Sequence, residues 1–368
     1  MTDGRRVALV HDWLTGMRGG EKVLDAIAEL YPDATLYTLL HVRGTASPRL
    51  EAMPERRSFV QWLPFARTHY RSYLPLFPAA VAQFSFDDYD LVISTSHCAV
   101  KSVIVPDRTP HICYCHSPMR YAWDQFDAYF GPDQVGRLRS RLLRPIMGRL
   151  ARWDAATADR VDRYVANSHY VAGRIRRYYN RGSTVVYPPV DTVFYRPDPS
   201  RRPDPFFLVV SALVPYKRLD VAIRACAAAK RPLVIVGRGP EEARLRTLAG
   251  PDVTFTGWLP DQEVRALYQR CQAVLMPGVE DFGMVPVEAQ ACGRPAIALA
   301  EGGALESVID GVTGVLVREP SEGAFADALD RLSARAFDQA AIRAHAETFG
   351  RARFQQEFQM IVNETLPS

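Results

Sequence analysis

The sequence predicts an α/β protein built of two doubly wound domains, and three observations support this. Short apolar runs rich in Val, Ile and Leu alternate with longer amphipathic stretches, which is the pattern of parallel strands joined by crossover helices. The pattern stops at a proline-rich segment and then starts again. With 368 residues, 48% of them hydrophobic, the chain is long enough for two cores of ordinary domain size.

The first domain is expected to cover residues 1–190. Its apolar runs predict strands over residues 7–11, 35–40, 91–95, 111–115 and 163–167. The amphipathic stretches between them predict helices that include residues 21–30 and 137–158.

Residues 191–205 are expected to form a linker, because six prolines between Tyr187 and Pro205 exclude a packed helix or a central strand. The second domain is then expected to cover residues 206–350. Its predicted strands are residues 207–211, 233–237, 253–256, 273–276, 296–299 and 315–317. Residues 351–368 predict a terminal helix that crosses back onto the first domain.

Composition narrows the class of protein. No apolar run reaches the roughly 18 residues of a membrane-spanning helix, so we expect a cytoplasmic protein, or one peripheral on the inner face of the cell membrane. The six cysteines lack metal-ligand spacing and are expected to be reduced and mostly buried. Residues 1–190 carry 25 Lys and Arg against 18 Asp and Glu, which favours this half as the one that meets an anionic partner. No nucleic-acid partner is expected.

Open parallel sheets bind ligands beyond the carboxyl ends of their strands, so the candidate motifs are those that follow strands. The strongest motif follows the strand ending at residue 276. It places Glu280 and Glu288 eight positions apart, with Gly283 and Pro286 between them. Gly283 allows close backbone approach, and a helix over residues 285–291 would direct free N–H groups at a phosphate, with Glu288 in its first turn. The alternative is a solvated Glu280 and a Glu288 that only complements the helix dipole.

Three weaker motifs follow other strands. Lys217 and Arg218 stand where a helix is expected to begin, a position that favours a bound anion over two exposed charges. Gly237 and Arg238 belong to a glycine-rich turn, which indicates nucleotide binding only if it lies beside the stronger motifs. In the first half, three residues come after strands: Gly19, Gly20 and His116. For His116 alone, a structural role would be the better interpretation.

Two patterns argue against other chemistries. The Asp-Tyr-Asp sequence at residues 88–90 resembles a metal-binding motif, but it precedes its strand, which indicates a solvated turn. No nucleophile elbow of the Gly-x-Ser-x-Gly kind is present, which weakens a hydrolase interpretation.

Taken together, EDFGMVPVEAQACGRP at 280–295, SALVPYKRLD at 211–220, GRGP at 237–240, the glycine turn before Glu21 and HSP at 116–118 resemble glycosyltransferase family 4, in the same order and over nearly the whole chain. The resemblance implies the GT-B fold, with two Rossmann-like domains facing each other across a cleft. It also implies a retaining, metal-independent transferase whose nucleotide-sugar donor, rather than a cofactor, binds the C-terminal domain.

Carried over by position, the resemblance assigns roles to these residues. Glu288 would bind the ribose hydroxyls and Lys217 the diphosphate. Glu280 and the backbone of Phe282, Gly283, Met284 and Val285 would bind the donor sugar. Gly19 and Gly20 would border the phosphates and the acceptor, and His116 would face the donor sugar. The family usually has an arginine where Ala212 stands, so one cation is missing or is replaced, with Arg218 as a candidate.

The finer resemblance, carried by HDWL at 11–14 and CHSPMRYAWD at 115–124, is to mannosyltransferases that use GDP-mannose in bacterial polysaccharide assembly. The expected acceptor is a saccharide or a polyprenyl-linked saccharide. Residues 137–152 place Leu138, Leu142, Ile146 and Leu150 on one helix face among six arginines, which predicts contact with anionic lipid or a core-facing helix with a basic outer side.

Two other functions stay open at this point. A nucleotide-sugar epimerase of GT-B fold would also bind a diphosphate, and an inactive nucleotide-sugar-binding module would explain Ala212.

Overall fold

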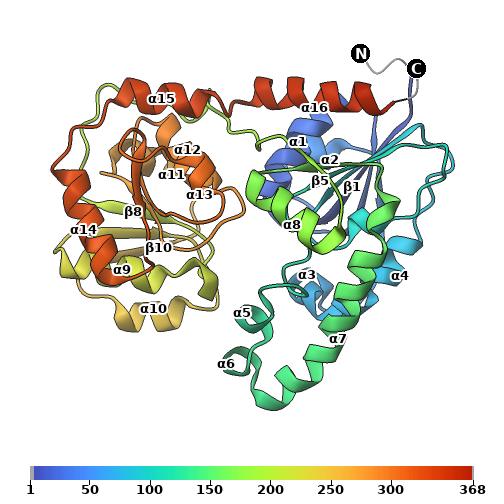
Figure 1. The fold of residues 1–368 in the computed structure, drawn as a ribbon, viewed down its shortest axis with the longest axis horizontal. Helices are drawn as coiled ribbons and strands as arrows, with labels where there is room; N and C mark the ends of the chain where they lie inside the picture. Colours follow the sequence, from blue (N-terminus) through green and yellow to red (C-terminus); the bar gives the residue numbers. More distant parts are fainter. Residues whose placement is uncertain (1–3, 367–368) are drawn as a thin grey trace. The chain divides into compact units, whose positions relative to one another are not determined.

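The structure is a computed structural model that describes residues 4–366. Residues 1–3 and the last two residues of the expected terminal segment 351–368 lie outside the described part. The chain forms two compact units: unit 1 combines the stretch up to Pro189 with the stretch from Phe354 onward, and unit 2 is Val190–Arg353. Figure 1 shows each unit as a sheet covered by helices.

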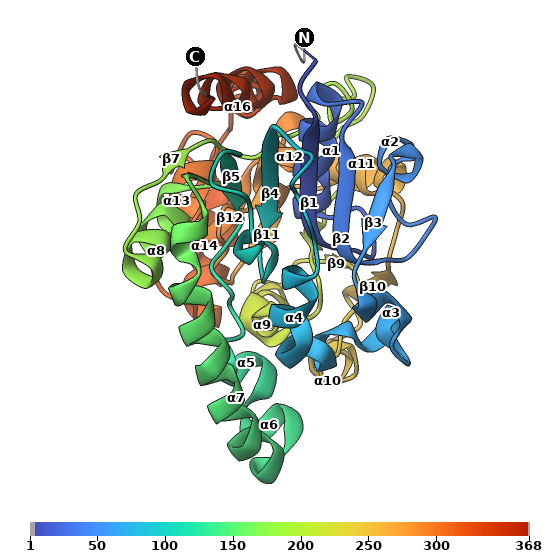
Figure 2. The ribbon, with the colours of Figure 1, turned by 90° about the vertical axis from the view of Figure 1, so that its right-hand side faces the viewer.

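Unit 1 contains a parallel sheet of seven strands in the order β3-β2-β1-β4-β5-β6-β7. The strands are β1 Val7–Leu14, β2 Thr35–His41, β3 Glu55–Arg57, β4 Leu91–Ser96, β5 His111–Cys115, β6 Arg163–Ala166 and β7 Thr184–Val185. The sequence analysis missed β3 and β7, which are short edge strands without a buried apolar run. Strand β1 is buried throughout and runs three residues beyond its expected end. Figure 2 shows the strands from β5 to β3 side by side.

Helices cover both faces of this sheet and pack apolar core clusters against it. The helices are α1 Gly19–Leu30, α2 Pro48–Ala52, α3 Ala66–His69, α4 Phe77–Ala82, α5 Phe126–Phe130, α6 Pro132–Val135, α7 Arg137–Ala156 and α8 His169–Tyr179. Four 3-10 helices connect them, η1 Phe59–Trp62, η2 Tyr70–Leu76, η3 Val100–Ser102 and η4 Ala158–Arg160.

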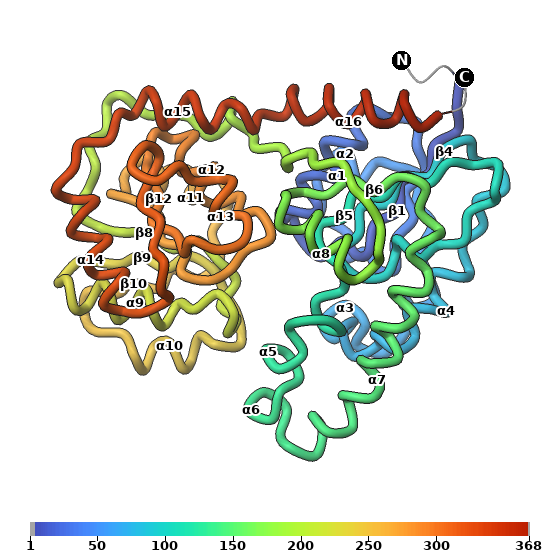
Figure 3. The backbone as a smooth tube through the Cα atoms, in the orientation of Figure 1, coloured from blue at the N-terminus to red at the C-terminus, as the bar shows by residue number. Residues whose placement is uncertain are grey.

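The terminal helix α16 (Arg351–Thr365) completes the core of unit 1. Phe354 and Phe358 are fully buried there, with their rings stacked at 5.8 Å and the ring of Tyr114 beside them. Gln355 donates a hydrogen bond to the carbonyl of Ala26 in α1. Figure 3 shows the last segment of the chain returning beside the first helix.

Unit 2 contains a parallel sheet of six strands in the order β10-β9-β8-β11-β12-β13. The strands are β8 Phe207–Val210, β9 Leu233–Val236, β10 Val253–Gly257, β11 Val274–Met276, β12 Ala296–Leu299 and β13 Gly314–Val317. The helices are α9 Leu219–Ala228, α10 Glu242–Leu248, α11 Asp261–Arg270, α12 Met284–Ala291, α13 Ala304–Ser307, α14 Glu322–Ser333 and α15 Gln339–Glu347, with η5 Pro215–Lys217 before α9. All six strands were expected, with ends within a residue of those observed.

The proline-rich segment expected as a linker is held against unit 2. Arg343 of α15 donates hydrogen bonds to the carbonyls of Thr192 at 2.7 Å and Tyr195 at 2.6 Å. Val190 forms a bridge with Gly350. The segment therefore has defined partners in the unit that follows it.

In each sheet the strand order reverses direction at one place, between β1 and β4 in unit 1 and between β8 and β11 in unit 2. At such a place the loops after the two neighbouring strands turn to opposite sides of the sheet. The space between these loops, at the carboxyl edge, can hold a ligand. The candidate ligand-binding residues of each unit are therefore expected at this edge.

Candidate active site

Two loops of unit 2 meet beside this reversal point. The loop after β11 carries Gly278, and a Cβ atom added there would overlap the carbonyl oxygen of Tyr216 and lie 2.7 Å from the Cα of Lys217, in the loop after β8. Only glycine permits this approach. The approach brings Lys217 to Glu280, and their ammonium and carboxylate groups form an ion pair in which both side chains are largely covered.

The N-terminus of α12 borders this ion pair. The helix begins at Met284, with Gly283 as its N-cap at a φ of 85°, a conformation that favours glycine. A Cβ atom at Gly283 would lie 3.7 Å from the Cβ of Glu280. Glycine has no side chain that could cap this end of the helix. Since the first N–H groups of a helix have no acceptor within it, this end can bind an anion.

Glu288 lies deeper than expected. The helix starts one residue before its expected start, so Glu288 is its fifth residue, beyond the first turn, and the expectation of a first-turn carboxylate was wrong. The side chain is buried and accepts a hydrogen bond from the hydroxyl of Tyr268 at 3.0 Å. Burial, together with the charge of Glu288, raises the pKa of Tyr268 well above its usual range. The tyrosine therefore stays a donor that fixes the carboxylate.

Arg218 does not share the partner of Lys217. It caps α9 in a left-handed conformation with a φ of 51°, and its guanidinium group pairs with Asp220 at 3.4 Å. The two neighbouring cations thus have different acidic partners. The place of Arg218 in donor binding stays a prediction.

The turn at Gly237 packs directly against the loop that carries Ala212. A Cβ atom at Gly237 would overlap the carbonyl oxygen of Ser211, and the N–H of Leu213 donates to the carbonyl of Arg238 at 3.0 Å. Arg238 is exposed and forms no ion pair with any residue from 4 to 366. An uncompensated cation therefore follows β9, next to the loop whose arginine position is occupied by Ala212.

Phe282 contributes its backbone to this edge, because its side chain belongs to the core. The ring is buried and contacts Phe349, with ring centroids 5.4 Å apart. Met284 and Val285 are the first two residues of α12 and are partly exposed. Their N–H groups, rather than their side chains, suit the site to an anion.

In unit 1, the two glycines lie against a histidine. Gly19 and Gly20 open α1, two residues before the expected start of this helix. A Cβ atom at Gly20 would lie 3.5 Å from Nε2 of His116 and 3.7 Å from Cε1 of His11. The structure therefore brings Gly20 and His116 together, as the motifs indicated, and adds His11.

Glu21 follows these glycines and is also buried. Its carboxylate accepts the N–H of Arg18 at 3.1 Å. Burial raises the pKa of Glu21 to about 7.

The sequence analysis missed an aspartate that organises this edge. The carboxylate of Asp12 accepts the backbone N–H groups of all four residues from His97 to Val100, at 2.7 to 3.0 Å. It also lies 3.3 Å from Nδ1 of His97. Asp12 therefore fixes the loop after β4.

Burial also sets the protonation of the histidines. It lowers the pKa values of His11 and His97 to about 3, so both rings are neutral near pH 7. Nδ1 of His11 is paired with the hydroxyl of Thr95 at 2.7 Å. The sequence signal that could have indicated these residues was the polar pair His11-Asp12 within an otherwise apolar strand.

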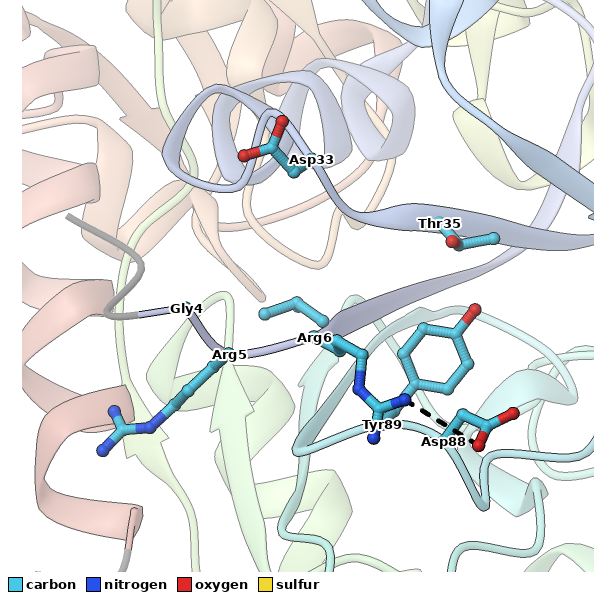
Figure 4. A pocket seen from close by; sticks show the side chains of 8 residues that line it. Gly4, Arg5, Arg6, Asp33, Thr35, Asp88 and Tyr89 are labelled. Carbon is cyan, nitrogen blue, oxygen red and sulfur yellow. Dashed lines mark ion pairs between the residues drawn. The ribbon is translucent and has the colours of Figure 1, made fainter.

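A surface pocket lies at the opposite, amino edge of the unit 1 sheet. Figure 4 shows Arg6 and Asp88 lining it, paired at 3.8 Å, with Tyr89 beside them. Asp90 accepts the N–H of Arg6 at 2.7 Å. The Asp-Tyr-Asp sequence therefore serves the turn before β4.

Three further properties concern the described residues as a whole. Between residues 4 and 366, all six cysteines are buried and form no disulfide. Over the same range, no group of three His, Cys, Asp or Glu side chains is arranged to hold a metal ion. None of the described helices is both long and apolar enough to span a bilayer.

Two protein-family models match consecutive parts of this chain. The family model described as Glycosyltransferase Family 4 matches residues 17–194, and the one described as Glycosyl transferases group 1 matches residues 194–348. D-inositol 3-phosphate glycosyltransferases from Mycobacterium bovis and Mycobacterium tuberculosis are 32% identical over 225 residues, covering 52% of this chain and 46% of theirs. The chain spans about half the length of these curated relatives.

Solved structures share the fold over both units. Anabaena HepE in complex with UDP and glucose has a TM-score of 0.71 at 19% identity, and sucrose-phosphate synthase from Thermosynechococcus elongatus has 0.71 at 18%; each comparison covers 98% of this chain and 99% of the other. The lipopolysaccharide outer core galactosyltransferase WaaB in its apo form has 0.65 at 18%, covering 98% and 100%.

The architecture is therefore the GT-B fold, with two Rossmann-like parallel sheets and a terminal helix that returns to the first unit. The two consecutive family matches, taken with this fold, support a glycosyltransferase of the family 4 type.

Proposed function

We propose that this chain is a retaining hexosyltransferase that moves mannose from GDP-mannose to a saccharide or a lipid-linked saccharide in cell-surface polysaccharide synthesis. The observation that carries the proposal is the convergence of Lys217, Glu280 and the open N-terminus of α12 at one edge of unit 2. A lysine and a helix N-terminus both favour a diphosphate. A carboxylate beside them suits the hydroxyl groups of a sugar.

The ion pair suggests how the donor enters. Glu280 neutralises Lys217 in the structure, so a diphosphate has to replace this carboxylate at the ammonium group. The released Glu280 then accepts hydrogen bonds from sugar hydroxyls. In this way, binding of the phosphate and binding of the sugar become coupled.

The proposed chemistry is a front-face substitution. The bond between the anomeric carbon and the diphosphate oxygen breaks, and the acceptor oxygen forms its bond to the same face of that carbon. The acceptor proton passes to the leaving phosphate oxygen. Lys217 and the α12 N–H groups stabilise the growing negative charge, and this needs no metal ion.

The remaining residues have supporting roles in the proposal. Glu288, fixed by Tyr268, binds the ribose hydroxyls. Arg238 supplies the cation that Ala212 lacks, since its turn packs on the Ala212 loop and it has no acidic partner among residues 4–366. Gly20 and His116 border the acceptor and the donor sugar.

A thermal-shift panel tests the donor. We expect GDP-mannose to raise the melting temperature more than UDP-glucose or other nucleotide sugars, because a ligand that binds only the native state stabilises it. UDP-glucose is the natural comparison, because Anabaena HepE, which shares the fold, is in complex with UDP and glucose. A larger shift with UDP-glucose would contradict the mannose assignment, and no shift with any nucleotide sugar would contradict the transferase.

A second assay separates the two open alternatives. Incubation with GDP-mannose and no acceptor should leave the sugar unchanged or slowly hydrolysed. Conversion to another sugar would instead indicate an epimerase. Donor binding without transfer to any saccharide or lipid-linked acceptor would indicate an inactive binding module.

A further inference from the structure

The segment between β3 and β4 exposes large apolar side chains on unit 1. Trp62 is 74% exposed and Phe65 is 78% exposed, and Phe59 and Leu76 are exposed in the same segment. Single exposed apolar residues are common on protein surfaces, whereas several in one short segment indicate an interaction site.

The backbone at Phe65 strengthens this argument. Phe65 has a φ of 55° as the N-cap of α3, a left-handed conformation that is unfavourable for a bulky residue. Its ring is 78% exposed and makes an edge contact with His69, with centroids 6.5 Å apart. The chain therefore holds this ring outward without compensation from its own core, as is typical of binding segments.

Arginines accompany the exposed rings. Residues 56–86 contain four arginines, and the nearest acidic residues, Glu55 and the three aspartates at 87, 88 and 90, flank this stretch. Arg67 is exposed and forms no ion pair within the described part of the chain. The guanidinium group of Arg57 lies 5.6 Å from the ring centroid of Trp62. Arg57 also pairs with Glu55 at 3.6 Å, so Arg67 supplies the positive charge without an acidic partner beside these rings.

Helix α7 presents a second surface of the same kind. Its expected apolar face is divided: Leu150 is buried, but Leu138 is 73% exposed and Leu142 is 62% exposed. The core-facing interpretation therefore holds from Leu143 onward and fails for the first turns of the helix. Five of its arginines are exposed and form no ion pair with a described residue. They are Arg137, Arg139, Arg141, Arg149 and Arg152.

The two surfaces rest on one core. Val60 and Tyr70 beneath the aromatic segment belong to the same apolar cluster as Leu150 of α7. Arg71 donates to the hydroxyl of Tyr121 at 3.1 Å, which links the segment to the chain that leads into α5 and α7. Figure 2 shows α3 and the first turns of α7 beyond the carboxyl ends of β1 and β4.

We propose that this aromatic–arginine surface, made of Phe59, Trp62, Phe65, Arg67 and the first turns of α7, docks on an anionic bilayer. The rings and leucines enter the interface, and the arginines bind lipid phosphates. Nucleic acid would match the arginines but not the exposed leucines, whereas an anionic bilayer matches both. The proposal rests on the proposed function, since a lipid-linked acceptor is presented at a membrane.

Vesicle sedimentation of the full chain tests the proposal, with phosphatidylcholine vesicles that contain or lack phosphatidylglycerol. We expect binding to the anionic vesicles that weakens as salt is raised. Trp62→Ser with Phe65→Asn should lower the partition coefficient by at least about a hundredfold, because two rings that would enter the bilayer interface are lost. Asparagine tolerates the left-handed conformation, so the fold should persist. Arg137→Gln, Arg139→Gln and Arg141→Gln together should remove most of the salt dependence.

Trp258→Ser is the matched control, because Trp258 is 67% exposed but belongs to unit 2. This variant should sediment like the unchanged protein. Equal sedimentation of the Trp62/Phe65 variant and the control would overturn the proposal. So would retention on heparin that depends on the α7 arginines without any sedimentation with vesicles.

The thermal shift with nucleotide sugars, measured without lipid, separates this proposal from the proposed function. A chain that is stabilised by GDP-mannose but does not sediment contradicts the docking surface alone. A chain that sediments but is stabilised by no nucleotide sugar contradicts the transferase alone.

Discussion

The carboxyl edges of the two sheets are built in different ways. The edge of unit 2 holds partly exposed charged groups, Lys217 and Glu280, on loops that glycines allow to touch. The edge of unit 1 holds the buried ring of His11 and the partly covered ring of His97, both kept neutral near pH 7, around the carboxylate of Asp12. One sheet topology thus supports an edge with a partly exposed ion pair and an edge with neutral histidines around a buried carboxylate.

The largest expected effect is at the edge with the ion pair. Lys217→Ala should lower turnover by roughly 10²- to 10³-fold, because it removes a donor aimed at developing negative charge. The measurement is sugar transfer at saturating donor. Arg224→Ala is the control, since Arg224 is an exposed cation of α9 whose partner is Glu322. Equal rates for both variants would remove Lys217 from the site.

The glycine contact of the same edge should give the next effect. Gly278→Ala places a methyl group against Tyr216 and Lys217, so the loops must separate. We expect a loss of about 1–3 kcal/mol in the free energy of unfolding, as for other overpacked sites. Turnover should fall with it. Urea unfolding and transfer assays measure both.

Gly250→Ala is the control for this variant, because a Cβ atom at Gly250 would meet no atom within 4 Å. It should be close to neutral. A Gly278→Ala protein with normal stability and turnover would show that the two loops need not touch.

The histidines predict a pH dependence that is strongest in unit 1, where burial lowers the pKa values of His11 and His97 to about 3; in unit 2 burial also lowers the pKa of His345. His97 has a pKa of about 3 in the folded chain and an ordinary value of 6.5, so the unfolded chain binds more protons between these values. Stability therefore falls as pH drops from 6.5 toward 3, by at most about 1.4 kcal/mol per pH unit for each such histidine. Glu21 acts in the opposite direction between 4.5 and about 7, because its pKa is raised.

His97→Asn isolates the contribution of one ring. The difference in stability between this variant and the unchanged chain should shrink as pH falls below 6.5. Urea titrations with pulsed hydrogen exchange would report each unit separately. A difference that is constant with pH would show that His97 is charged, or accessible, in the folded chain.

The smallest expected effect concerns the exposed cation of unit 2. Arg238→Ala should weaken donor binding by about tenfold, since a charge-assisted hydrogen bond to phosphate is lost at a partly solvated position. Titration with GDP-mannose measures this. Arg246→Ala is a fair comparison, because Arg246 is exposed on the following helix and already pairs with Glu242. Unchanged affinity would show that Arg238 does not replace the arginine that the family usually has at the position of Ala212.

The sequence was most informative where a local pattern decides the structure. The apolar runs of β5 and β12 predicted the bounds that the structure has, and the glycine-flanked Glu280 motif indicated the correct edge of the sheet. By contrast, Asp12 and the loop it holds are about 85 residues apart in sequence, so no local pattern joins them. Strand β3 is polar and exists because it pairs with β2, and such pairing is invisible to hydropathy.

Glu288 shows a subtler limit. The motif placed it on the correct helix, but the start of the helix depends on Gly283 adopting a left-handed conformation, which shifted the register by one residue. Its partner Tyr268 comes from another helix, α11. Tertiary contacts therefore decide how deeply Glu288 is buried, although the sequence motif had already indicated this residue.

Helix α16 has a consequence for biosynthesis. Phe354 and Phe358 fill the core of unit 1, yet the ribosome delivers them after every residue of unit 2. The amino-terminal lobe, although made first, has to wait for its final packing elements, whereas residues 190–353 emerge as one uninterrupted stretch. In a nascent chain, unit 2 should therefore complete its folding before unit 1. Loss of the last dozen residues should destabilise unit 1, although unit 1 is translated first.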